Sequence, residues 1–81
     1  MQNNFHDISS ILKFHRKRSG LTQSRLAELA GTGKTVVFDL EKGKQTIQLD
    51  TLLKILKALN ITARFESPIM EQYLKTKEVS R

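Results

Sequence analysis

The segment at residues 21–43, LTQSRLAELAGTGKTVVFDLEKG, constrains the fold more than any other part of this 81-residue chain. It holds two short apolar patterns of helical period with Gly31 between them. Thr22 can cap the first helix through its hydroxyl, and Gly43 lies where a left-handed residue would end the second. We therefore expect two short helices joined by a tight turn. Their apolar residues are Leu26, Ala27, Leu29 and Ala30 in the first and Val36, Val37 and Leu40 in the second.

Two short helices with a glycine turn, the second keeping polar residues on its outer side, are typical of a helix-turn-helix unit. The charge balance agrees with this interpretation. Lys and Arg number 14 against 8 Asp and Glu, which gives a net charge of +6 and a pI near 10.0. Such basicity is expected of a nucleic-acid-binding domain, although a basic surface that merely faces solvent is a common alternative.

The size and composition of the chain exclude several classes of protein. A chain this short makes one small domain with a single core. It has no cysteine, so it can form neither a disulfide framework nor a thiolate metal site. No apolar run approaches the roughly 20 residues of a membrane span, and residues 1–10 lack the basic-then-apolar order of a signal peptide. We therefore expect a soluble, cytoplasmic protein with no membrane partner.

Two further helices flank the central pair. The first is expected from Asp7, as cap, to about Ser19, and its one face should hold Ile8, Ile11, Leu12 and His15. The other is the strongest helical pattern in the chain and should be core, with Asn60 as its left-handed terminator. Between the central pair and this helix lies a polar loop, residues 42–46, that suits contact with a DNA backbone through Lys42 and Lys44. The core residues expected in the last helix are Leu49, Leu52, Leu53, Ile55, Leu56 and Leu59.

Residues 61–67, ITARFES, change from helical period to strict alternation, which predicts a strand that Pro68 ends. A lone strand in a helical chain leaves its backbone groups without partners. Antiparallel pairing across a twofold axis would satisfy them in a homodimer and bury Ile61, Ala63 and Phe65. Pairing within the chain, or an unpaired extended tail, is the alternative. Residues 68–81 are mostly polar and are expected to form either a short helix or a frayed tail.

Enzymatic and metal-binding functions find little support in the sequence. Gly33-Lys34-Thr35 resembles the end of a phosphate-binding loop, but that motif requires a glycine where this chain has Glu28. His6 and His15 have no matching carboxylate for zinc. No serine, histidine and acid stand out as a triad, and so small a domain leaves little room for a catalytic cleft. We expect no enzyme activity, no cofactor and no metal.

With these residues in place, the chain resembles the Cro/phage-repressor helix-turn-helix family, also called XRE-like regulators. The resemblance covers about residues 8–60 and rests on LTQ, LA, AG and LExG at the spacings of the family. More narrowly, LEKGK-x-T leading into LDTLLKILKALNI and a strand looks like the HipB-type antitoxins. Those proteins repress their own operon as dimers and bind a HipA-like serine/threonine kinase toxin.

The resemblance implies an all-α, lambda-repressor-like domain of four or five helices at residues 1–60, a dimerisation strand at 61–67 and a tail at 68–81. It also implies an internal ion pair between Arg16 and Glu41. The resemblance places Gln23 where it would contact a phosphate or a base edge. It also implies that the recognition helix, which enters the major groove, begins near Gly33. Phe38 departs from the small polar residue usual in the family, and Asp39 has a structural alternative as a cap or as a partner of Lys42. The residues expected at DNA are Gln23, Gly33, Lys34, Thr35, Phe38, Asp39, Lys42 and Lys44.

From these observations the sequence predicts a dimeric, sequence-specific DNA-binding repressor of a palindromic operator. The resemblance implies that it is the antitoxin of a HipA-like kinase module and regulates its own operon. Two alternatives remain at this point. One is a stand-alone regulator without a toxin partner, and the other is a helical adaptor whose main role is to bind another protein.

Overall fold

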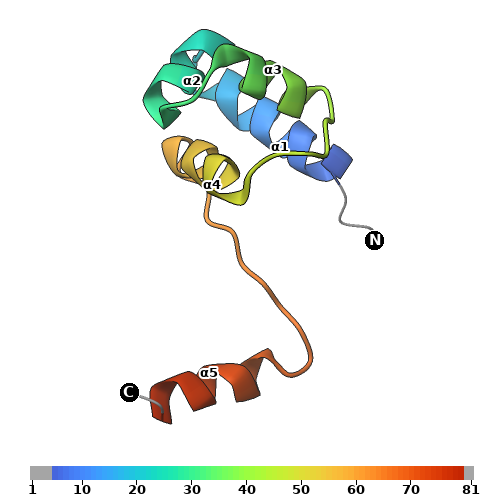
Figure 1. The fold of residues 1–81 in the computed structure, drawn as a ribbon, viewed down its shortest axis with the longest axis vertical. Helices are drawn as coiled ribbons and strands as arrows, with labels where there is room; N and C mark the ends of the chain where they lie inside the picture. The colour runs from blue at the N-terminus through green and yellow to red at the C-terminus, as the bar shows by residue number, and fades with distance from the viewer. Residues whose placement is uncertain (1–4, 80–81) are drawn as a thin grey trace.

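The computed structural model describes residues 5–79, and within that range it contains five α-helices and no strand. Four of them pack into one body: α2 contacts both α3 and α4, and α1 contacts α3. The last helix, α5, stands apart from this body at the end of an extended segment (Figure 1). The helices are α1 (Phe5–Arg18), α2 (Gln23–Ala30), α3 (Lys34–Glu41), α4 (Leu49–Ala58) and α5 (Met70–Val79).

The core lies where the apolar faces of α1, α2, α3 and α4 meet, and each helix contributes at least one side chain that is almost wholly buried. Leu12, Leu26, Val37 and Ile55 are each no more than 1% exposed. Burying a side chain of this size stabilises the folded state by about 1.5–3 kcal/mol. The helix-turn-helix pair is thus fixed to the body by α1 and α4. The remaining buried apolar residues are Ala27, Ala30, Leu40 and Leu59.

The ends of the helices follow the predicted local signals. The Thr22 hydroxyl accepts a hydrogen bond from the backbone N–H of Arg25 at 3.0 Å. Gly31 ends α2 in the left-handed conformation with φ 73°, and Asn60 takes φ 59° after α4. α1 begins at Phe5, so Asp7 lies in its first turn rather than at its cap, where it still complements the helix dipole.

The apolar face of α4 is narrower than predicted. Ile55 and Leu59 are buried and Leu52 and Leu56 are partly buried, whereas Leu49 is 67% exposed and Leu53 is 47% exposed. Leu29 of α2, also expected in the core, is 51% exposed. The helical period located the apolar stripe correctly but overestimated its width, because the small body has room for about one face of each helix. α4 consequently presents uncovered leucines to its surroundings.

The predicted strand at residues 61–67 is not present within the described chain. The segment runs extended away from the end of α4 (Figure 1), but no backbone partner lies beside it, so it forms no ladder. The physical reason is that a strand requires a second strand, and residues 5–79 of one chain supply none. Phe65, expected in a dimer interface, is 79% exposed. Pairing across a twofold axis therefore remains a proposal.

The tail contains a helix, α5, which is one of the two predicted outcomes for residues 68–81. The end of the predicted tail, residues 80–81, lies outside the described residues, as do residues 1–4 and the side chain of His6. None of the helices in the described chain is both long enough and apolar enough to cross a membrane.

Candidate nucleic-acid interface

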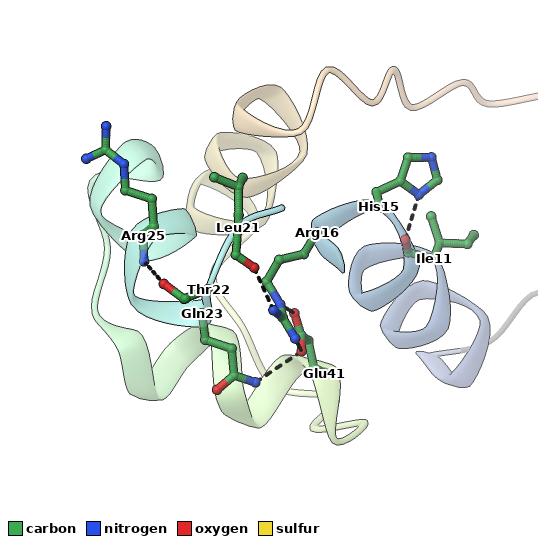
Figure 2. Close-up of polar contacts among 8 residues, drawn as sticks. All are labelled: Ile11, His15, Arg16, Leu21, Thr22, Gln23, Arg25 and Glu41. Carbon is green, nitrogen blue, oxygen red and sulfur yellow. Dashed lines mark hydrogen bonds and ion pairs between the residues drawn. The ribbon is translucent and has the colours of Figure 1, made fainter. Parts of the chain in front are cut away.

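A buried ion pair fixes the end of α3 to α1. The guanidinium of Arg16 donates to both carboxylate oxygens of Glu41, from Nε at 2.6 Å and from the second terminal nitrogen at 3.0 Å (Figure 2). Its other terminal nitrogen donates to the backbone carbonyl of Leu21 at 2.8 Å. The two side chains are 10% and 3% exposed. This two-point geometry confirms the predicted pair and sets the orientation of α3 relative to α1.

The ion pair also controls the charge state of its members. Burial alone would raise the pKa of Glu41, but hydrogen bonds from Arg16 and Gln23, together with the positive charges of Arg16 and Lys13, outweigh burial and hold that pKa below its ordinary value of 4.5. The hydrogen bond that Arg16 donates to Glu41 raises the pKa of Arg16 despite desolvation. Both groups therefore stay charged over the neutral range.

Gln23 has a structural partner that the sequence did not reveal. Its Nε2 donates to Oε1 of Glu41 at 3.1 Å, so the side chain extends from the first turn of α2 toward the ion pair (Figure 2). It is partly exposed, so it remains within reach of a ligand at the surface. The prediction that Gln23 contacts DNA is untested, and the structure adds a second role, in which Gln23 links α2 to the end of α3.

The outer face of α3 carries the residues predicted to read DNA. Lys34, Thr35 and Phe38 are exposed, while Val37 and Leu40 on the opposite face are buried, as expected. The spacing of Lys34, Phe38 and Lys42 is four residues, which places them in one row along the helix. The ammonium of Lys42 lies 5.1 Å from the centre of the Phe38 ring, a cation–π contact that limits the freedom of both side chains.

Asp39 has a different partner from the one predicted. Its Oδ2 lies 3.8 Å from Nζ of Lys44, whereas Lys42, the expected intrahelical partner, lies over Phe38 instead. The backbone N–H of Lys44 also donates to the carbonyl of Asp39 at 3.0 Å. This pairing offsets the negative charge that Asp39 would bring close to DNA, and it ties the loop after α3 to the helix.

The start of α3 is weakly capped. Gly33 is the N-cap residue with φ −85° and ψ 152°, and its position provides no side-chain hydrogen bond to the first turn. Its backbone is one that any residue can adopt, and a Cβ built there would meet nothing within 4 Å. The backbone N–H of Val36 donates to the carbonyl of Gly33 at 3.1 Å, and the glycine supplies no side chain to cap the N–H groups of Lys34 and Thr35, which precede Val36.

A shallow hollow between α2 and the start of α3 extends this surface. It is lined by Thr22, Ser24, Arg25 and Lys34, among others. Ser24 and Arg25 were not among the predicted site residues, although the polar first turn that follows the Thr22 cap was a signal in the sequence. Arg25 already pairs with Glu28 at 2.6 Å on the open surface, where both are more than half exposed. An exposed pair of this kind is weak and can exchange for a phosphate.

These residues can bind a polyanion and distinguish among base edges. Lysine and backbone N–H groups donate to phosphate, lysine also donates to guanine, and an aromatic ring can pack on a thymine methyl. His15, by contrast, contacts the backbone carbonyl of Ile11 at 2.7 Å, away from this surface (Figure 2). In the described part of the chain, no group of three or more His, Cys, Asp or Glu side chains is placed to hold a metal ion.

Comparison with known proteins agrees with this architecture. The helix-turn-helix family matches residues 12–65. An HTH-type transcriptional regulator of Sinorhizobium fredii, y4mF, is 36% identical over 62 residues, covering 76% of this chain and 82% of the relative. The control protein C.SmaI of Serratia marcescens is 35% identical over 60 residues, covering 69% of this chain and 71% of that protein.

Two kinds of solved structure share the fold. A chain of a HipA–HipB–O2–O3 complex superposes with a TM-score of 0.74 at 24% identity, covering 84% of this chain and 96% of that one. The restriction–modification controller protein C.Esp1396I superposes with a TM-score of 0.65 at 23% identity, covering 93% and 91%. The family match spans the helix-turn-helix, its buried ion pair and α4. The chain belongs to the helix-turn-helix family of transcriptional regulators.

Proposed function

We propose that this protein is a sequence-specific DNA-binding repressor that acts as a homodimer. The observation that carries the proposal is the outer face of α3, where Lys34, Thr35 and Phe38 are exposed on a helix fixed by a buried ion pair. A helix held rigidly with long polar and aromatic side chains on its free face is what readout in a major groove requires. The net charge of +6 supplies the attraction to the phosphate backbone.

The dimer follows from residues 61–67. An extended segment that has no partner strand and carries a phenylalanine that is 79% exposed is a ready template for pairing with another chain. Antiparallel pairing with a second copy satisfies the backbone and covers Phe65, with Ile61 and Ala63 on the same side. Two α3 helices about 34 Å apart would then reach successive major grooves of a palindromic operator.

The first test is selection of an operator from random duplex DNA, followed by titration at several salt concentrations. The proposal expects an enriched sequence with twofold symmetry and an affinity that falls steeply as salt rises. An affinity that depends on salt but not on sequence would show that the protein binds DNA only nonspecifically. No binding to either duplex would favour the alternative of a helical protein–protein adaptor.

A narrower proposal is that the protein is the antitoxin of a HipA-like serine/threonine kinase toxin and represses its own operon. The likeness of the fold to a chain of the HipA–HipB–O2–O3 complex supports it. So does the LEKGK segment that leads into α4. The test is whether a kinase encoded beside this gene binds the protein in a stable complex and loses toxicity when the two are co-expressed.

A second candidate is a stand-alone regulator without a toxin partner. The 35% identity to the control protein C.SmaI favours it, because that likeness extends over most of both chains. A neighbouring kinase gene whose product binds the protein would exclude this candidate. If no such gene is present and the protein still binds its operator, the stand-alone regulator is favoured over the antitoxin.

A further inference from the structure

The end of the chain leaves more apolar surface uncovered than the proposed strand pairing can bury. Besides Phe65, the exposed large apolar side chains here are Leu53 of α4 at 47%, Ile69 at 63%, and Tyr73 and Leu74 of α5 at 54% and 51%. A specific interface buries about 800 Å² on each partner, whereas one aromatic residue contributes about 150–250 Å². Phe65 therefore supplies only part of such an area, and the exposed apolar side chains of α4 and α5 can supply more.

α5 itself needs a partner. It has ten residues, and isolated helices shorter than about 12–15 residues are marginal in water. It stands clear of the four-helix body (Figure 1), so its own body does not cover it. The chain turns just before α5, where the backbone N–H of Met70 donates to the carbonyl of Ser67 at 3.2 Å, and α5 then runs clear of its own body (Figure 1). A second molecule can therefore supply the cover that α5 lacks.

We propose that the C-terminal arms are exchanged in the homodimer, with α5 of each chain packed antiparallel along the exposed face of α4 of the partner subunit. This inference rests on the proposed pairing of residues 61–67. Antiparallel pairing about the middle of that segment sets Ser67 beside the partner's Ile61. The chain then arrives at the end of the partner's α4 and continues toward its start.

The two helices match in length and in apolar position. Each has ten residues and is about 15 Å long. Tyr73 and Leu74 lie in the middle of α5, and Leu53 lies in the middle of α4, so the antiparallel arrangement brings their exposed side chains together. An open groove at the end of α4, lined by Leu53, Leu56 and Ile61 among others, lies where the arm would enter.

One pair of charges also fits this direction. α4 has Asp50 in its first turn and Lys57 in its last, and α5 has Glu71 in its first turn and Lys77 in its last. The antiparallel arrangement sets Glu71 beside the partner's Lys57, whereas a parallel one would set it beside the partner's Asp50. At the other end the sequence places Glu78 next to Lys77, so that end favours neither direction. The pair of Glu71 with the partner's Lys57 therefore agrees with the direction that the strand pairing dictates.

Disulfide trapping tests the exchange. The chain has no cysteine, so no native thiol can form a competing disulfide. Leu53→Cys and Leu74→Cys are made in separate chains that carry tags of different mass, and the two are mixed, refolded and oxidised. The proposal expects a disulfide that joins the two different chains. Gln72, two residues from Leu74 and on the other side of α5, provides the control: Gln72→Cys mixed with Leu53→Cys should link several-fold less. Both leucines are exposed, so circular dichroism should show unchanged folding.

The double variant, with both cysteines in one chain, distinguishes exchange between two chains from folding back within one chain. Exchange predicts a covalent dimer on a non-reducing gel. An internally closed monomer would show that α5 folds back on its own α4, and no disulfide at all would show that α5 docks on neither; both overturn the exchange. Sedimentation and operator binding are measured on the wild-type chain, so an intact DNA-binding dimer without the link contradicts the exchange alone.

Charge reversal tests whether α5 packs antiparallel to the partner's α4. Lys57→Glu and Glu71→Lys should each weaken the dimer by roughly two- to tenfold, since each change acts twice per dimer. Combining them in one chain should restore the wild-type dimer dissociation constant. Additive losses in the double variant would contradict the antiparallel arrangement.

Discussion

At the residue scale, Lys34 is the cation on the outer face of α3 that lies nearest the start of the helix. If its ammonium donates to guanine, Lys34→Ala should cost about 1–3 kcal/mol of operator binding and relax specificity at one base pair. Fluorescence anisotropy on the operator, on operators changed at single positions and on random duplex measures this. Lys54→Ala, which removes a charge that is also exposed but lies on α4, is the matched control. Equal losses on the operator and on random duplex would assign Lys34 to phosphate instead.

Phe38 is the residue for which the structure narrows the alternatives most. It is 44% exposed with Lys42 over its ring, so it is held at the surface and is not a core residue. We expect it to pack on a thymine methyl, a contact worth about 0.8 kcal/mol. Replacing thymines of the operator by uracil one at a time should weaken binding by the wild-type protein at one position. Phe38→Ala should be insensitive there, and a wild-type protein indifferent to every replacement would contradict the contact.

Arg16 acts on stability. Removing it leaves the buried Glu41 carboxylate without its main partner, so Arg16→Ala should cost roughly 3–5 kcal/mol of unfolding free energy at neutral pH. Because the pKa of Glu41 is lowered in the folded state, the stability from the pair is present above pH 4.5 and is lost as pH falls through that lowered pKa. The difference in unfolding free energy between Arg16→Ala and the wild type should therefore become smaller in acid. Urea unfolding at several pH values measures it, and an unchanged Arg16→Ala protein would refute the structural role.

At the element scale, the ends of helices could be predicted from the sequence and some of their faces could not. Thr22, Gly31 and Asn60 act through bonds and backbone angles within a few residues, so the sequence contains the whole cause. The exposure of Leu49 depends on how much of α4 the other helices cover. The bond from Gln23 to Glu41 joins residues 18 apart in sequence. Such properties arise from packing, which a local pattern does not record.

The candidate site divides in the same way. The apolar side of α3 was predicted by period, whereas the residues of its outer face and the Arg16–Glu41 pair were predicted by family resemblance. The pairing of Asp39 with Lys44 was not, because a helical spacing rule favours Lys42 and cannot foresee that Lys42 lies over Phe38. The strand at residues 61–67 was predicted from alternation, which is a local pattern, whereas a strand also needs a partner strand, and residues 5–79 of one chain offer none.

The N-cap of α3 gives a prediction about the stability of that helix. Gly33 has an extended backbone, space for a Cβ and no side-chain cap, so Gly33→Ser should add a hydrogen bond to the first turn of α3. We expect a stabilisation of a few tenths of a kcal/mol, seen as a small rise in Tm by calorimetry. Thr22→Ala, which removes the existing cap of α2, should lower stability by about 1 kcal/mol and serves as the opposite control. A lower Tm for Gly33→Ser would show that the start of α3 does not accept a side-chain cap.

At the scale of the whole molecule, a single body presents one α3 and can read one half-site. In the proposed dimer, two bodies joined at residues 61–67 would read two half-sites at once, and the second binding event would become intramolecular. Operator affinity should therefore depend on the dimer more than on any one base contact. Phe65 is the residue through which this dependence is tested, because it is the most exposed of the large apolar residues in the described chain.

Phe65→Asp should separate the dimer, because it would bury two carboxylates close to the twofold axis where an apolar contact is proposed. Sedimentation should show a monomer, while circular dichroism and Tm of the body stay close to wild type, since Phe65 makes no core contact. Binding to a palindromic operator should fall to the level of a single half-site. Leu29→Asp, which places the same charge on an exposed apolar position of α2, should leave the dimer intact. An intact Phe65→Asp dimer would rule out pairing of the extended segments across the axis.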